Sequence, residues 1–176
     1  MRVTLIGIDP GIVDTGLVAL TLDVEAKTLD IQHRVWSNVT RRAGASIIVE
    51  GEFLHEMVLF VKSLPGVPFI YIEGFRNRGR DMHQDQKMTV LVHQIQAVIK
   101  DSHIVDNTGV KKVVKEGLLN LMHISRWPRT NHADLKSAAR IALKGAIENE
   151  KLNLLIAIYV HDTLRGNLWT ITRSSG

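Results

Sequence analysis

The first part of the chain alternates between apolar runs and short polar turns, a pattern typical of a β-meander. Three runs rich in β-branched and aliphatic residues cover residues 3–9, 16–23 and 28–36. Gly11 and Gly16 allow the tight return that brings the second run beside the first. The pattern predicts three neighbouring strands, of which the first is buried.

Helical and strand-like patterns then alternate. Apolar residues recur at helical spacing over residues 47–64 and 86–100, and a strand-like run follows each, at residues 69–73 and 102–106. A later alanine-rich run, residues 135–143, predicts another helix. The alternation predicts an α/β fold with a mixed central sheet flanked by helices.

The length of 176 residues fits one compact domain, residues 1–176. Residues 152–176 form a C-terminal extension to which the pattern assigns no role. Within the extension we expect a strand or short helix at 152–160, a loop at 161–162 and a last strand at 169–171.

Two of the apolar strands end on a carboxylate where the chain must turn. Asp9 is followed by Pro10 and Gly11, which cannot continue a strand, and Glu73 is followed by Gly74. A carboxylate withdrawn from water needs a compensating partner, most economically a cation. Two neighbouring strands that end in this way place their carboxylates together at one edge of the sheet. The alternative for each acid is that it merely ends a strand in a turn.

A third acid, Asp134, lies in the first turn of the alanine-rich helix, where the helix dipole favours an anion. Small residues let this helix approach the sheet closely: Ala138, Ala139 and Ala142. The approach carries Asp134 and the nearby His132 toward the two strand-end carboxylates. An acidic helix cap without further function is the alternative.

Composition narrows the chemistry. Because the chain has no cysteine, disulfides and thiolate metal sites are excluded, and carboxylate and imidazole remain as the strong ligands. Hard oxygen ligands favour Mg²⁺ or Mn²⁺. No charged and apolar leader precedes the first strand, and the longest apolar run, residues 154–160, is far shorter than the ~20 residues of a membrane span. We therefore expect a cytoplasmic protein without a membrane partner.

Basic residues gather in the second half of the chain. The formal net charge is +4, and residues 75–144 hold thirteen Lys and Arg against six Asp and Glu. This distribution predicts a face for a polyanion, although a solvated basic surface fits the same count. A candidate DNA-binding loop follows Glu73, because arginine forks match phosphate oxygens and an aromatic ring can stack on bases. Its residues are Phe75, Arg76, Arg78 and Arg80.

A second basic group is expected on a helix capped by Asp106 or Thr108. Its lysines are candidates for phosphate contacts, and an amphipathic surface is the alternative: Lys111, Lys112 and Lys115.

In order and spacing over residues 2–149, these motifs resemble the RuvC-type Holliday junction resolvases of the RNase H-like superfamily. The motifs are Gly7-Ile8-Asp9-Pro10-Gly11 with Thr15-Gly16, then Glu73 with its basic aromatic loop, then His132-Ala133-Asp134. The chain is more similar to phage-borne relatives than to the bacterial type. Bacterial members usually close the site with two carboxylates three residues apart, and counting back three from Asp134 gives Asn131. His132 is the rival for this fourth position.

The resemblance implies an RNase H-like fold and a homodimer that resolves four-way DNA junctions by paired symmetric nicks in DNA recombination and repair. It implies two Mg²⁺ (or Mn²⁺) ions per site, held by Asp9, Glu73 and Asp134, with Asn131 as a further ligand. His132 would ligate or move a proton. The basic loop would open the junction.

Two other functions stay open. The carboxylate cluster does not encode substrate geometry, so an RNase H-like nuclease acting on flap or branched DNA or on an RNA-DNA hybrid fits as well. A non-catalytic junction-binding protein fits if Asn131 marks a degraded site.

Overall fold

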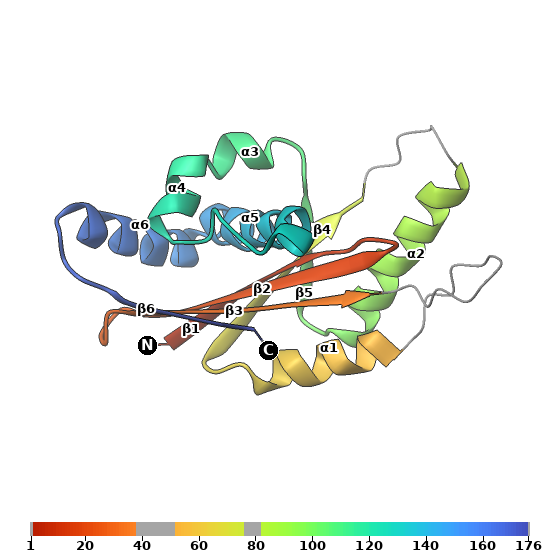
Figure 1. Ribbon diagram of the computed structural model, residues 1–176, viewed down its shortest axis with the longest axis horizontal. Helices are drawn as coiled ribbons and strands as arrows, with labels where there is room; N and C mark the ends of the chain where they lie inside the picture. Colours follow the sequence, from red (N-terminus) through yellow and green to blue (C-terminus); the bar gives the residue numbers. More distant parts are fainter. Residues whose placement is uncertain (1, 38–51, 76–81, 176) are drawn as a thin grey trace.

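The computed structural model describes residues 2–37, 52–75 and 82–175. Its centre is a six-stranded sheet with the order β5-β4-β1-β2-β3-β6 (Figure 1). The strands are β1 (Arg2–Asp9), β2 (Asp14–Asp23), β3 (Thr28–Ser37), β4 (Val67–Gly74), β5 (Ser102–Asp106) and β6 (Thr170–Ser175).

The sheet is mixed, as the sequence predicts. β1, β2 and β3 pair antiparallel in a meander, β4 and β5 extend the sheet parallel to β1, and β6 adds parallel to β3 at the other edge. β1 and β2 are buried along almost their whole length, which explains why both read as nearly continuous apolar runs.

Helices cover both faces of the sheet (Figure 1). The helices α1 (Glu52–Ser63) and α2 (Met82–Val98) enclose one core cluster with residues of β1, β2 and β4. The opposite cluster is larger and includes buried residues of the helices that follow β5. Its helices are α3 (Val110–Val113), α4 (Glu116–Leu121), the 3₁₀ turn η1 (Arg129–Asn131), α5 (His132–Glu148) and α6 (Glu150–Leu164).

The helix α5 lies unusually close to the sheet because the residues between them are small. A Cβ on Gly7 of β1 would lie 1.9 Å from the backbone oxygen of Ala138, so only glycine fits there. Ala138, Ala139 and Ala142 are fully buried, as expected. This close packing sets the first turn of α5 over the ends of β1 and β2.

Several expected boundaries are wrong. Residues 161–162 lie in the last turn of α6 rather than in a loop. Residues 152–160, expected as a strand or a short helix, are helical and form the middle of α6. The cause is Asn149, whose side chain accepts hydrogen bonds from the backbone N–H groups of Lys151 and Leu152 and starts a new helix directly after α5. The last strand, expected at 169–171, begins one residue later and is longer, as β6 (Thr170–Ser175).

The cap expected on the lysine-bearing helix is also wrong. Gly109 is the N-cap of α3, whereas the Asp106 side chain accepts hydrogen bonds from the N–H and hydroxyl of Thr108 and forms a turn. The first expected helix occupies Glu52–Ser63, and 47–51 lie outside the described residues. The second runs over Met82–Val98. Among the described residues, no helix has the length and apolar character needed to cross a bilayer.

Candidate active site

Asp9 and Glu73 meet at one end of the sheet, as the strand pattern predicts. β1 and β4 are parallel neighbours with Ile8 opposite Ile72, so the next residue of each strand, Asp9 and Glu73, lies at the same end of the sheet. The two carboxyl groups are hydrogen-bonded to each other. Burial above all, then the charges of Glu73 and Asp134, raises the pKa of Asp9 to about 9. Asp9 therefore carries a proton where an ordinary carboxyl would be ionised.

Asp134 reaches this group from the first turn of α5. Its backbone and Cβ lie directly over Gly16 of β2, where an added Cβ would lie 3.0–3.1 Å from Asp134 atoms. Burial raises the pKa of Asp134, and the nearby charge of Asp14 adds to the effect. The small residue on β2 thus lets α5 carry a carboxylate to the end of β1.

Two residues that the sequence reasoning missed hold the carboxylate of Glu73. Ser137 donates a hydrogen bond from its hydroxyl to Oε2, and Asn107 donates one from its amide to Oε1, each over 2.9 Å. The Ser137 hydroxyl also lies beside Asp9, which partly offsets the rise in the pKa of that carboxyl. Both oxygens of Glu73 are therefore oriented by neutral donors.

The sequence contains one clue that Ser137 belongs to the site, namely its position along α5. It follows Asp134 by three residues, and residues three apart share one face of a helix. Counting three residues forward from Asp134, instead of back to Asn131, would have found it. Asn107 comes directly after β5, the parallel neighbour of β4, but only the sheet order reveals that it faces Glu73. Asp14, at the start of β2, was missed for the same reason.

The two rivals for a fourth site residue lie differently. The Nδ1 atom of His132 accepts a hydrogen bond from the backbone N–H of Trp127 at 3.2 Å, and the ring lies near Glu116. Neutral His132 in this arrangement carries its proton on Nε2, so it is a donor rather than a free metal ligand. Asn131 directly precedes α5, and its side chain forms no hydrogen bond with the described residues.

The expected DNA-binding residues divide into three groups. Phe75 is partly buried and packs against the α1–α2 core cluster, as an anchored rather than a free aromatic ring. The three arginines of its loop lie outside the described residues: Arg76, Arg78 and Arg80. Three lysines are exposed in and directly after α3, which contacts α5: Lys111, Lys112 and Lys115.

The carboxylate group fits a hard divalent cation by its charge and donor chemistry. Asp9 is buried beside Glu73 and near Asp134, and burial first, then these charges, raises its pKa, so a cation would stabilise the ionised form of the group. All of the donor atoms are oxygens, as Mg²⁺ and Mn²⁺ prefer. Within the described residues, no three acidic or imidazole side chains already converge in metal-binding geometry. The carboxyl groups of Asp9 and Glu73 are instead hydrogen-bonded to each other.

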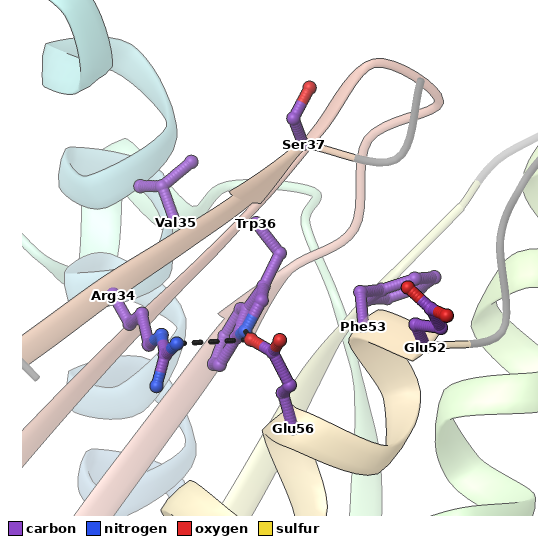
Figure 2. Close-up of a pocket in the computed structure, with 7 residues that line it drawn as sticks. All are labelled: Arg34, Val35, Trp36, Ser37, Glu52, Phe53 and Glu56. Carbon is purple, nitrogen blue, oxygen red and sulfur yellow. Dashed lines mark hydrogen bonds and ion pairs between the residues drawn. The ribbon is translucent and has the colours of Figure 1, made fainter. Parts of the chain in front are cut away.

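A separate pocket of about 280 Å³ lies between β3 and α1 (Figure 2). Glu56 points into it and accepts hydrogen bonds from Arg34 at 3.0 Å and from the Trp36 indole at 3.1 Å. These polar groups satisfy one another, so the contact ties α1 to the sheet.

Compared by sequence, the chain matches no protein-family model and no curated protein. Compared by structure, it is similar to T. thermophilus RuvC in complex with Holliday junction substrate, at 18% identity and a TM-score of 0.55, over 96% of this chain and 98% of that one. A second T. thermophilus RuvC structure aligns at 21% identity and a TM-score of 0.49, over 83% of this chain and 93% of the other. The chain therefore has the RNase H-like fold of RuvC, with its mixed sheet flanked by helices.

Proposed function

We propose that this protein is a divalent-metal-dependent endonuclease that resolves four-way DNA junctions by paired symmetric nicks. The observation that carries the proposal is the buried pair of carboxyl groups, Asp9 and Glu73, with the charge of Asp134 close enough to raise the pKa of Asp9. A similar fold in T. thermophilus RuvC, seen with a Holliday junction substrate, supports the choice of DNA substrate. We further propose that the whole chain, residues 1–176, is one nuclease domain.

Asp9, Glu73 and Asp134 would hold the metal, with Asp14 close to Asp134. Two bound Mg²⁺ or Mn²⁺ ions would supply an activated water and stabilise the leaving 3′ oxygen at a phosphodiester. Ser137 and Asn107 fix the direction in which Glu73 presents its oxygens. His132 is held through Nδ1 and so presents the N–H of Nε2 as a hydrogen-bond donor.

The proposal includes a homodimer, because paired symmetric cuts require two active sites on one junction. It also includes a role in DNA recombination and repair in the cytoplasm of a bacterium or of a phage-infected host. The exposed lysines beside α5 support a polyanionic partner.

A cleavage panel tests the proposal. A labelled four-way junction, a linear duplex, a flap and an RNA-DNA hybrid are each incubated with Mg²⁺ or Mn²⁺ and either the native protein or the variant Asp9→Asn. We expect symmetric nicks in the junction alone, lost in the variant while junction binding persists. Cleavage of flap or hybrid instead would overturn the substrate. Tight junction binding with no cut in either metal would overturn the nuclease and favour a junction-binding protein.

A further inference from the structure

A second pocket, of about 420 Å³, lies where the last strand meets the loop that precedes α5. We call it the β6 pocket. Of the described residues, its lining consists of His33, Arg126, Trp127, Pro128, Arg173, Ser174 and Ser175. None of these is acidic, and none belongs to the carboxylate group. β6 runs beside β3 at the edge of the sheet, which brings the end of the chain to this loop (Figure 1).

The guanidinium of Arg173 is held in a fixed position within the β6 pocket. It lies 3.9 Å from the ring centroid of Trp127 and donates a hydrogen bond to the backbone oxygen of Arg126 at 3.0 Å. Partial desolvation lowers the pKa of Arg173, while part of the side chain stays exposed to solvent. Neither Arg126 nor Arg173 forms an ion pair with a carboxylate in the described part of the chain.

The pocket also contains two buried ring nitrogens without partners. His33 packs edge-on against Trp127 with the ring centroids 5.1 Å apart. Neither Nδ1 of His33 nor Nε1 of Trp127 has a hydrogen-bond partner among the described residues. Leaving a buried hydrogen-bonding group without a partner is unfavourable. Burial and the charge of Arg173 lower the pKa of His33, and its other ring nitrogen bonds to the Ser174 backbone, so the free Nδ1 is an acceptor. The pocket therefore combines uncompensated positive charge with one unused donor, the indole N–H of Trp127, which suits an anion with acceptor oxygens.

We propose that the β6 pocket binds a phosphate of the DNA backbone, as a second anchoring point away from the reacting strand position. The rim residues Arg126, Arg173 and Ser175 are exposed, so a long polyanion can reach the pocket from solvent. The pocket is also joined to the active site, because the backbone N–H of Trp127 bonds to His132 at the start of α5. The inference rests on the proposed function in so far as the ligand is DNA.

The test compares the native protein with the double variant Arg126→Gln/Arg173→Gln. Affinity for a four-way junction is measured with Ca²⁺ or EDTA in place of the catalytic metal, over a range of KCl concentrations. Each phosphate contact contributes about 0.9 to the slope of log affinity against log salt. We expect the slope to fall by about 1 and the affinity at ~0.1 M salt to fall about tenfold.

The matched control is Lys62→Gln/Lys100→Gln, which removes the same charge from exposed positions at the ends of α1 and α2. We expect this control variant to have the same slope of log affinity against log salt as the native protein. Thermal unfolding verifies that each variant is folded. If the double variant is not, Arg126→Gln alone is measured, because the hydrogen bond from Arg173 goes to its backbone and remains.

The outcomes separate this inference from the nuclease proposal. A double variant with native slope and affinity overturns the pocket and leaves the nuclease intact. A reduced slope in a protein that never cuts supports the pocket and overturns the nuclease. If inorganic phosphate raises the melting temperature of the native protein but not of the double variant, while the DNA slopes are equal, the pocket is a free-anion site and DNA is overturned as its ligand.

Discussion

The carboxylate group at the end of β1 and the β6 pocket carry opposite charges that their own neighbours do not balance. Asp9 has acidic neighbours and is kept protonated by burial and repulsion. Arg173 has an aromatic ring and a carbonyl as neighbours, and no described carboxylate faces it. Under the proposed function, a metal-bound phosphodiester would bring a cation to the first region and phosphates to the second. The two regions thus hold unbalanced groups of opposite sign, which the two kinds of ligand of the proposed reaction would compensate.

The largest expected effect is that of Asp9→Asn on cleavage. The amide keeps the size of the side chain but removes the charge that attracts the metal, and metal catalysis contributes several kcal/mol. We expect the junction-cutting rate to fall at least about a hundredfold, measured in single-turnover assays with Mg²⁺. Variants of the β6 pocket remove no metal ligand, so their single-turnover rate at saturating protein should stay within a few-fold of native. An equal loss in both would remove the distinction between the two regions.

A second large effect is a dependence of stability on pH. The pKa of Asp9 is about 9 in the folded protein, against 3.8 for an aspartate side chain in water. The folded state binds this proton more tightly than the unfolded state does. The stabilisation of the folded protein by the proton is therefore fully present below pH 3.8 and is lost as the pH rises toward about 9. In chelator, the free energy of unfolding should fall by up to about 1.4 kcal/mol per pH unit in this window.

Two comparisons verify the origin of that pH dependence. Asp9→Asn should flatten it in denaturant titrations at pH 5, 7 and 9. Mg²⁺ should also flatten it in the native protein, because the cation replaces the proton. A native slope that persists in Asp9→Asn would show that another group titrates.

Ser137→Ala tests the support of Glu73 and should have an intermediate effect. The change removes one of two hydrogen bonds that orient the carboxylate. Loss of such outer contacts typically lowers metal affinity or activity 10–100-fold. We expect the Mg²⁺ concentration for half-maximal cleavage to rise about tenfold. Ser63→Ala, which removes a hydroxyl bonded to a carbonyl in α1, is the control. An unchanged Mg²⁺ dependence in Ser137→Ala would mean that Asn107 suffices.

The smallest effect is expected from Lys111→Gln/Lys112→Gln. These lysines are exposed and solvated, whereas Arg173 is held by a ring and a carbonyl before any ligand binds. Less conformational freedom is lost when a fixed group binds. We expect junction affinity to fall only about two- to threefold at ~0.1 M salt, measured as for the β6 pocket. A larger loss than that of Arg126→Gln/Arg173→Gln would reverse the ranking of the two basic surfaces.

The sequence predicts the parts of this molecule that depend on local pattern. The strands around Asp9 and Glu73 have the apolar runs of buried β-structure, and an acid directly after each run marks the edge of the sheet. Their meeting needs only that the two strands be neighbours. The mixed sheet with flanking helices was predictable for the same reason.

The remaining features depend on contacts between residues far apart in the chain. Asn107 faces Glu73 only because β5 joins β4, and Ser137 reaches it only because α5 packs onto Gly7. The β6 pocket forms only because residues 170–175 pair with β3, which lies far earlier in the sequence. No local periodicity encodes these contacts.

Paired cutting of a cruciform tests the central claim most directly. A supercoiled plasmid that extrudes a four-way junction is incubated with the native protein and Mg²⁺, and the products are separated on a gel. Two nicks made within the lifetime of one junction give linear plasmid, and Asp9→Asn should give neither linear nor nicked product. Nicked circles alone would contradict paired resolution. Linear product from Asp9→Asn would contradict the carboxylate site itself.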